Sequence, residues 1–165
     1  MIFLKTNNVT RFLDAQNIQY DAFELPAEKL GAMETAEYLN VPIELVYKSI
    51  ILMQPNLKPI LCMVPGNAQV DLKAVAGFLG IKKVRLTSQT EAENVSGLQT
   101  GGISPLALLH RGFLMIMDNS VEGLEEIHIS GGERGLNLRM RVPDLQNIIK
   151  ARVWKISSIP GDETA

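Results

Sequence analysis

Ser49-Ile-Ile-Leu-Met-Gln54 and Lys58-Pro-Ile-Leu-Cys-Met-Val64 are two apolar runs separated by the turn residues Pro55 and Asn56. Runs of this length bounded by Pro and Asn are typical of strands, and the short link predicts an antiparallel β-hairpin. Further strand candidates are also joined by short links, while helical segments are interspersed among them. This pattern favours an α+β domain with a mixed sheet over a regular parallel α/β fold.

Capping and periodicity signals predict the elements around this hairpin. The clearest helix begins after the capping residue Asp71 and ends before Gly80, with apolar residues at helical spacing between them. Alternating apolar and polar residues predict strands in the same way. We expect helices over 6–16, 34–40, 72–79, 88–95 and 144–152, and strands over 18–23, 113–117, 126–130 and 136–141.

The length of 165 residues predicts a single domain with a sizeable core. We place this domain at residues 1–158 and expect residues 159–165 to form a disordered C-terminal tail. No apolar run approaches the roughly 20 residues of a membrane span, so no membrane association is expected. The first six residues are too short for the apolar region of a signal peptide. The default expectation is a cytoplasmic protein.

Composition limits the chemistry that this chain can perform. Cys62 is the single cysteine and lies in an apolar run, which favours a buried, inert thiol over a nucleophile. The two histidines, His110 and His128, are too few and too far apart for a metal cluster, so we expect neither a metal nor a cofactor. A net charge of −2 gives no polycationic footprint for gripping long nucleic acid, although recognition of one nucleotide remains open.

Gly101-Gly102-Ile103-Ser104-Pro105 is the first candidate for a functional loop. Adjacent glycines let a ligand approach the main chain closely, and such a loop can present backbone N–H groups to an anion or a developing oxyanion. The alternative is a simple tight turn. Lys48, at the start of an apolar strand, can hold a phosphate or polarise a carbonyl, unless it only snorkels at a strand edge.

A second glycine-rich turn, Ser130-Gly-Gly-Glu-Arg-Gly-Leu136, leads into a strand rather than a helix. This context excludes a Rossmann or P-loop nucleotide site. Together with Lys48 the two loops become a suggestive set if they converge in space. No Ser/His/Asp triad is convincing. The basic residues Arg139 and Arg141, and the cluster Lys82, Lys83 and Arg85, are either solvated surface or contacts for a phosphate backbone.

Five segments of the chain resemble the YbaK / prolyl-tRNA synthetase-associated editing domain family, and they stand in the same order as in that family and at nearly the same spacing. They are Val46-Tyr-Lys-Ser-Ile50, Asp71-Leu72-Lys73 with Val75-Ala76, Gly80-Ile-Lys-Lys-Val84, Gly101–Pro105, and Ile129-Ser-Gly-Gly132 with Arg134-Gly-Leu136. The resemblance covers residues 6–152. It implies a single-domain α+β fold with a twisted, barrel-like mixed sheet surrounded by helices.

The resemblance also implies an activity. Members of this family hydrolyse the ester that links a wrong amino acid to tRNA, typically cysteine or alanine on the proline tRNA, and we expect this chain to do so in trans. They use no protein nucleophile, because water attacks with help from a ribose hydroxyl of the substrate's terminal adenosine. The expected partners are the 3′ acceptor end of tRNA and an aminoacyl-tRNA synthetase. The oligomeric state stays open.

Site residues follow from the resemblance by position in this sequence. Lys48, Gly101 and Ser104 are the expected catalytic residues. The expected substrate-binding residues are Gly102, Ile103 and Pro105 in the first loop, Ser130, Gly131 and Gly132 in the second, and Phe23 and Asn137. Asn137 stands where well-known YbaK-type members have aspartate, and Phe23 where they have tyrosine. These positions therefore lack a charge and a hydroxyl, respectively.

Two alternatives to the deacylase interpretation remain. One is a non-catalytic module that binds a tRNA end, a nucleotide or a synthetase, which the uncharged Asn137 and the low positive charge keep open. The other is a hydrolase for small aminoacyl or nucleotide esters unrelated to tRNA. Hydrolysis of mischarged tRNA would distinguish an enzyme from the binding module. Hydrolysis of aminoacyl-adenosine alone would indicate the small-ester hydrolase.

Overall fold

Strand β3 (Ile60–Pro65) is buried along its whole length inside a five-stranded sheet. The computed structural model, which describes residues 6–160, orders this sheet β5-β2-β3-β6-β9. β2 and β3 form the predicted antiparallel hairpin, whereas β3–β6 and β6–β9 are parallel pairs, so the predicted mixed sheet is confirmed. The remaining strands are β2 (Tyr47–Met53), β5 (Arg85–Leu86), β6 (Leu114–Asp118) and β9 (Arg152–Trp154).

A second sheet of three antiparallel strands has the order β1-β8-β7. Its strands are β1 (Asp21–Glu24), β7 (Glu126–Ser130) and β8 (Leu136–Arg141). The two sheets meet where Val46, directly before β2, forms a parallel bridge with His128 on β7. The short strands β4 (Gln69–Val70) and β10 (Ser157–Ser158) form a separate pair. The sheet that we expected as one barrel-like unit is thus divided into two principal sheets that meet at this bridge.

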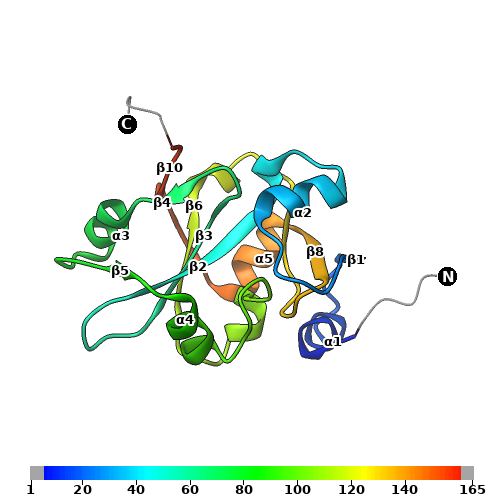
Figure 1. The fold of residues 1–165 in the computed structure, drawn as a ribbon, viewed down its shortest axis with the longest axis horizontal. Coiled ribbons are helices and arrows are strands. Elements are labelled where there is room, and N and C mark those ends of the chain that lie inside the picture. The colour runs from blue at the N-terminus through cyan, green and yellow to red at the C-terminus, as the bar shows by residue number, and fades with distance from the viewer. Residues whose placement is uncertain (1–5, 161–165) are drawn as a thin grey trace.

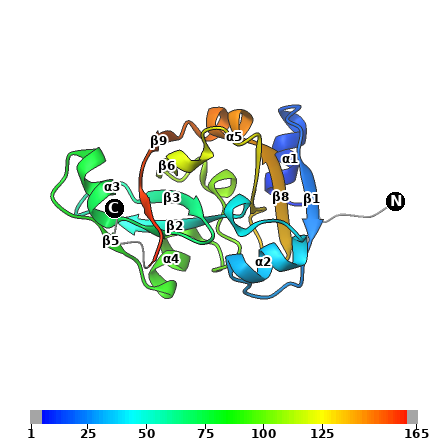
Figure 2. The same cartoon turned by 90° about the horizontal axis from the view of Figure 1, so that it is seen from above.

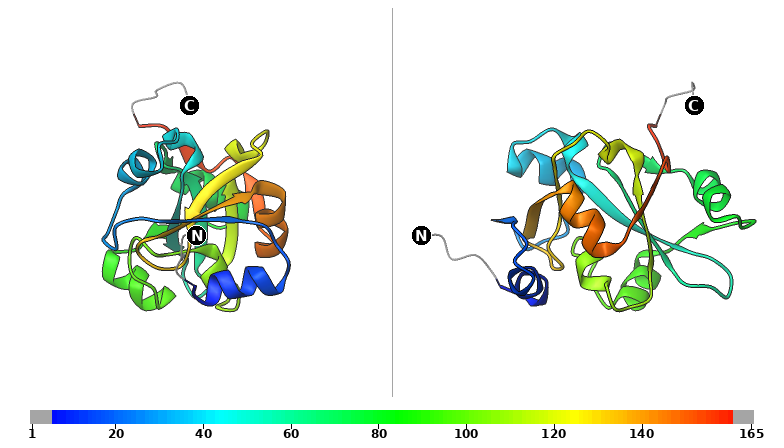
Figure 3. Two further views of the ribbon diagram at one scale, coloured as in Figure 1. Left: turned by 90° about the vertical axis from the view of Figure 1, so that its right-hand side faces the viewer. Right: turned by 180° about the vertical axis from the view of Figure 1, so that it is seen from behind.

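Helices surround the sheets, as expected for this α+β fold. In Figures 1 and 2, α3 and β5 lie at one end of the molecule and α1 and β1 at the other, while Figure 3 shows α5 from behind. The helices of the described chain are α1 (Asn8–Ala15), α2 (Ala32–Leu39), α3 (Leu72–Leu79), α4 (Gln89–Ser96) and α5 (Val142–Ile149), with 3-10 turns η1 (Ile43–Leu45), η2 (Pro105–Leu108) and η3 (Asn119–Val121).

The core lies on both faces of the five-stranded sheet, because side chains alternate along β3. Leu61 and Met63 face the second sheet, where they join a cluster with residues of β7 and β8. The other face of β3 packs under α3, with Cys62 among its residues. Burial raises the pKa of the Cys62 thiol to about 12, which agrees with the expected inert cysteine.

Several boundaries differ from the sequence predictions. Asn7 rather than Thr6 caps α1. α5 begins at Val142, two residues early, because Pro143 is well suited to a first helical turn. It ends at Ile149, so β9 begins at Arg152, the last residue of the range where we expected helix. Ile159 and Pro160 follow β10, and the rest of the expected C-terminal tail, 161–165, lies outside the described residues.

No helix within residues 6–160 is long and apolar enough to cross a membrane.

Two glycines of α3 provide a matched test of the helix assignment, since an added Cβ meets no atom within 4 Å at either position. Gly77 lies inside the helix, whereas Gly80 caps its end in the left-handed region with φ of +69°. We expect Gly77→Ala to raise the free energy of unfolding by about 1 kcal/mol. Gly80→Ala should lower it by about 1–2 kcal/mol, since an L-residue is strained there. Urea unfolding of both variants measures this; equal shifts would contradict the assignment.

Candidate active site

A cleft of about 500 Å³ lies where the two sheets meet. Four parts of the chain form its walls: the segment that leads into α2, the start of β2, the first glycine loop, and the adjoining ends of β7 and β8. In Figure 2, α2 and the labelled part of β8 lie on the same side of β2, near its start. Segments far apart in sequence therefore share one cavity, as the sequence interpretation required.

Lys48, near the start of β2, is half-buried in this cleft. Its Nζ donates a long hydrogen bond of 3.5 Å to the carbonyl oxygen of Gly66. Within residues 6–160, no carboxylate forms an ion pair with it. Burial lowers the pKa of Lys48, because the charged form loses solvation. This lysine therefore presents its Nζ to the cleft without a fixed counter-ion, as suits binding of a phosphate or carbonyl oxygen.

The two glycine-rich loops converge. A Cβ added to Gly102 would lie 2.8 Å from the Cα of Glu133, so the loops approach each other at backbone distance. Arg134 Nε donates a 2.7 Å hydrogen bond to the carbonyl oxygen of Thr100, which ties the second loop to the first. Gly101 is exposed at the cleft with φ of +94°, a conformation that favours glycine. The two loops thus form one wall of the cleft.

Five of the predicted site residues line the cleft: Lys48, Gly101, Ile103, Ser130 and Asn137.

Ser104 and Pro105 lie behind this lining. Ser104 is fully buried, and its hydroxyl accepts a hydrogen bond from the backbone N–H of Leu106. Pro105 occupies the first turn of η2, where its missing N–H is of no consequence. We expected Ser104 to act in catalysis. In the structure its side chain caps η2 and does not line the cleft.

The remaining glycines of the expected site serve packing between the loops. A Cβ on Gly131 would lie 2.5 Å from the side chain of Leu136, and Gly132 has φ of +99° beside Val9. Asn7, which caps α1, donates a hydrogen bond to the carbonyl oxygen of Gly131 at 2.9 Å. Like Gly102, these two glycines therefore support the wall from behind without lining the cleft.

Asn137 forms a buried pair with His128. His128 Nδ1 and Asn137 Oδ1 are 2.9 Å apart, with exposed fractions of 3% and 5% for the two residues. With Oδ1 as acceptor, Nδ1 carries the imidazole proton. Burial lowers the pKa of His128 and outweighs the hydrogen bond to Asn137, which raises it. The cleft is therefore lined at this position by Asn137, whose amide is paired with the buried His128.

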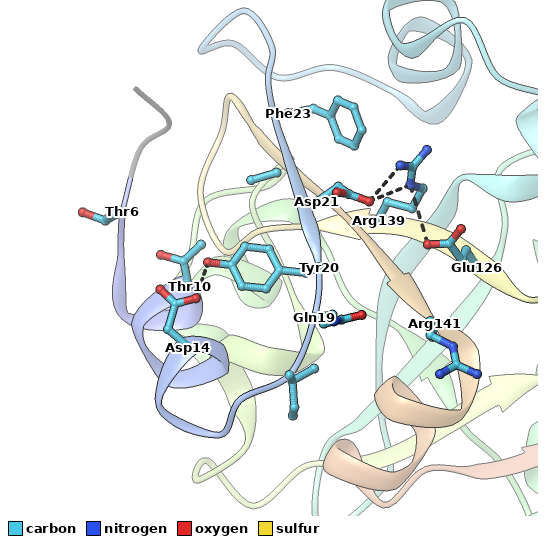
Figure 4. A pocket seen from close by; sticks show the side chains of 12 residues that line it. Thr6, Thr10, Asp14, Gln19, Tyr20, Asp21, Phe23, Glu126, Arg139 and Arg141 are labelled. Atoms are coloured by element: carbon cyan, nitrogen blue, oxygen red, sulfur yellow. Dashed lines mark hydrogen bonds and ion pairs between the residues drawn. The ribbon is translucent and has the colours of Figure 1, made fainter. Parts of the chain in front are cut away.

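Phe23 lies outside the cleft, in a larger open groove of about 800 Å³ over β1 and β8 (Figure 4). Its ring centre is 5.5 Å from that of His128, and the Arg139 guanidinium lies 5.5 Å from it. Arg139 forms ion pairs with Asp21 at 2.8 Å and Glu126 at 3.7 Å, as Figure 4 shows. Arg139 is therefore engaged by two carboxylates, whereas Lys48 in the smaller cleft forms no ion pair within residues 6–160, so the smaller cleft is the better candidate site for binding an anion.

Sequence reasoning missed three residues that hold the cleft together. Gly66 accepts the Lys48 hydrogen bond, and a Cβ there would lie 2.7 Å from that of Ala32. Arg134 and Thr100 join the loops. The local sequence of Pro65-Gly66-Asn67 indicates only the end of a strand. Nothing in it shows that Lys48 forms a hydrogen bond with this turn.

Within residues 6–160, no three His, Cys, Asp or Glu side chains are grouped so that they could hold a metal ion.

A family model described as the aminoacyl-tRNA editing domain matches residues 27–148. This range includes Lys48, both glycine loops and Asn137. The chain belongs to the aminoacyl-tRNA editing domain family.

Similar proteins agree with this assignment. A relative from Enterococcus faecalis, EbsC, named as a candidate Cys-tRNA(Pro)/Cys-tRNA(Cys) deacylase, is 25% identical over 153 residues, which cover 92% of this chain and 93% of the relative. A proline–tRNA ligase from Lactobacillus delbrueckii subsp. bulgaricus is 23% identical over 128 residues, 70% of this chain but 22% of the ligase. A solved structure, titled as a candidate trans-editing enzyme for prolyl-tRNA synthetase, matches with a TM-score of 0.75 and 20% identity over 93% of this chain and 99% of its own.

Gly102→Ala should separate the two loops, because the atoms that its Cβ would meet belong to the backbone of Glu133 and Arg134 and cannot rotate away. We expect a loss of about 1–3 kcal/mol in the free energy of unfolding, as in other overpacked sites. Urea unfolding measures the loss, and a wild-type midpoint in the variant would show that the loops tolerate separation.

His128 should make the stability of this domain fall as the pH falls below about 6.5. The pKa of His128 is lowered in the folded state, so the unfolded chain binds the proton more readily in that range. The stabilisation is complete above the unfolded pKa and is lost as the pH falls towards the folded pKa. NMR titration of His128 in the folded protein tests this. His128 should titrate below the value of about 6.5 for an unperturbed histidine, and titration above that value would contradict the assignment.

Proposed function

We propose that this protein is a trans-acting aminoacyl-tRNA deacylase that hydrolyses the ester of a mischarged tRNA in this cleft. The observation that carries the proposal is the convergence of Lys48 and the two glycine loops around one cavity within the range that the family model matches. The name of the Enterococcus relative, which aligns over nearly its whole length, supports the same reaction class.

Lys48 is the proposed catalytic cation. Its Nζ would hold a phosphate of the terminal nucleotide or polarise the ester carbonyl, where a charge in a partly desolvated site acts more strongly than in water. Gly101 would let the ester approach the main chain of the first loop. Ile103 and Ser130 also form part of the cleft surface.

Water is the proposed nucleophile. Ser104 is fully buried and engaged in capping, and Cys62 is buried with a raised pKa, so neither reaches a substrate as a nucleophile. The hydroxyls that do line the cleft, such as Ser130, have no histidine among the other lining residues to activate them. A ribose hydroxyl of the substrate would then orient the attacking water, in keeping with the resemblance to editing domains.

The amino acid accepted by the cleft is proposed to be small and uncharged, such as cysteine or alanine. Leu30, Val46, Ile103 and Leu136 supply apolar lining, and Asn137 contributes a neutral amide engaged with His128. Shape alone separates amino acids that differ by one methylene by only about 1–3 kcal/mol. Selection by size would therefore be moderate, and the tRNA must contribute to the choice of substrate.

The proposed setting is the cytoplasm, with the 3′ acceptor end of tRNA as partner. An aminoacyl-tRNA synthetase is a second proposed partner, because a similar segment makes up 22% of the Lactobacillus proline–tRNA ligase. A free-standing domain would meet its substrate after release from a synthetase.

A binding module without catalysis is the second candidate. The observation in its favour is the neutral His128–Asn137 pair, which leaves no carboxylate at that position to accept a proton. Such a module would bind aminoacyl-tRNA and leave the ester intact.

Replacement of Lys48 tests the proposed function. We expect Lys48→Met to lower the rate of deacylation at least about 100-fold, as the removal of one electrostatic contact to the reacting group does elsewhere. The fold should persist, because the change removes a partly buried charge. Lys58→Met, at an exposed lysine in the β2–β3 link, is the matched control. The assay is hydrolysis of a panel of mischarged tRNAs, led by cysteinyl- and alanyl-tRNA for proline.

Three outcomes would contradict the proposal. Equal rates for wild type and Lys48→Met would remove the lysine from the mechanism. No hydrolysis of any panel member by folded wild-type protein would favour the binding module. Hydrolysis of aminoacyl-adenosine without hydrolysis of aminoacyl-tRNA would indicate a small-ester hydrolase.

A further inference from the structure

The charges of this chain are unevenly distributed. Segments 72–86 and 148–160 hold seven of the 16 lysines and arginines and none of the 18 aspartates and glutamates. The rest of the chain therefore contains nine basic and 18 acidic residues. The net charge of −2 hides one strongly positive region in an otherwise acidic protein.

The two positive segments lie side by side. β10 pairs with β4 directly before α3, and the backbone N–H of Asp71 donates a 2.7 Å hydrogen bond to the carbonyl oxygen of Ile156. The rings of Phe78 on α3 and Trp154 on β9 stack with centroids 5.1 Å apart and planes at 28°. Arg152 adds its guanidinium 5.9 Å from the Phe78 ring. Figure 1 shows β10 and α3, and Figure 2 shows β9 and α3, in the part of the molecule away from α1 and β1. We define the α3–β9 patch as Lys73, Phe78, Lys82, Lys83, Arg152, Trp154 and Lys155.

The cations of the α3–β9 patch are exposed and have no carboxylate partner within residues 6–160. Arg85 is left out of the patch because Glu91 holds it in a bidentate ion pair at 2.7 and 2.8 Å. Trp154 is 51% exposed although it is a large aromatic residue. Unpaired cations around an exposed aromatic stack are typical of surfaces that bind nucleic acid through phosphates and bases.

We propose that the α3–β9 patch is a second tRNA contact, which binds the RNA phosphate backbone outside the cleft while the acceptor end occupies the cleft. This inference rests on the proposed function for the choice of RNA as ligand. The acidic remainder of the protein repels RNA, so binding is directed to this end of the molecule. Trp154 and Phe78 supply a stacking platform for an unpaired base or ribose beside the contacted phosphates.

The patch lies close enough to the cleft for one RNA to reach both. Gly66, whose carbonyl oxygen accepts the Lys48 hydrogen bond, is seven residues before Lys73. Seven extended residues span at most about 25 Å, which bounds the separation of the two sites along this segment. An RNA whose 3′ end meets Lys48 therefore needs to extend only this far to contact the start of α3.

Trp154 provides a direct readout, because it is the only tryptophan of the chain. Addition of uncharged tRNA to wild-type protein should change the fluorescence of Trp154, and added salt should reverse the change as phosphate contacts are released. An unaltered spectrum at tRNA concentrations that saturate binding in a separate assay would overturn the proposal.

Charge removal tests the cations. Lys82→Gln/Lys83→Gln and, separately, Arg152→Gln should each weaken tRNA binding, with a salt dependence whose slope falls by about 1 for each lost phosphate contact. In deacylation, these variants should raise KM for aminoacyl-tRNA several-fold with kcat unchanged. Their rates on aminoacyl-adenosine, which cannot reach the patch, should equal those of wild type. Arg11→Gln on α1, at the opposite end of the molecule, is the matched control and should change neither KM nor the slope.

The outcomes separate this proposal from the proposed function. Wild-type deacylation whose KM and salt slope are unaffected by the patch variants would overturn the second contact and leave the deacylase intact. If the wild type deacylates nothing, binding of uncharged tRNA still decides: patch-dependent binding supports the contact, and patch-independent or absent binding overturns it. Loss of synthetase binding alone in the patch variants would also overturn it, because the surface would then be a protein interface.

Discussion

The complete burial of β3 is the constraint on which the rest of the structure depends. Its side chains are apolar on both faces, so both faces must be covered, and each face requires its own partner. The β1-β8-β7 sheet covers one face and α3 the other. Because β2 pairs with β3 along its length, the residues at the start of β2 are fixed against the turn that ends β3. Lys48 and Gly66 meet as a consequence of this pairing.

The cleft depends on this arrangement through backbone contacts more than through side chains. The bridge between Val46 and His128 joins the sheets, and the glycine loops close the cavity at a distance that excludes a Cβ on Gly102. A lysine placed in such a cavity loses solvation without gaining a counter-ion, which destabilises the folded protein. The neutral His128–Asn137 pair adds no charge to offset this cost. Lys48 is therefore the part of the cleft suited to a negatively charged ligand group, while segment 28–34 contributes the carboxylates of Glu28 and Glu34 to the same lining.

Sequence reasoning recovered the features that depend on local patterns. The β2–β3 hairpin, the cap at Asp71 and the strand before Ser130 are encoded by residues next to them in sequence. β9 was missed because three residues carry too little periodicity, and its strand pairing comes from the parallel neighbour β6. The division into two sheets was also not predictable, since it depends on a bridge between segments about 80 residues apart.

The candidate site shows the same division between local and long-range information. Lys48, Gly101 and Asn137, which the resemblance assigned to the site, line one cleft, but the resemblance could not tell which loop residues line it. Ser104 and Gly102 lie behind the lining, because the Ser104 hydroxyl caps Leu106 and Gly102 packs against the backbone of Glu133. Phe23 sits in the groove over β1 and β8, where the strand register places it opposite Asn137 but beyond the cleft lining.

Charge shows why a whole-chain value can mislead. A net charge of −2 excludes a protein that is basic overall, and the sequence interpretation used it in this way. Electrostatic attraction of a polyanion depends instead on how the charges are arranged, because interactions beyond about 10 Å are screened at physiological salt. On that scale the exposed cations of α3 and β9 form a positive surface in which no carboxylate of residues 6–160 is ion-paired with them, since Asp71 caps α3, while α2 contributes Glu34 to the cleft lining. An approaching RNA is thus attracted first at α3. The segment before this helix contains Gly66, whose carbonyl oxygen accepts the hydrogen bond from Lys48 in the cleft.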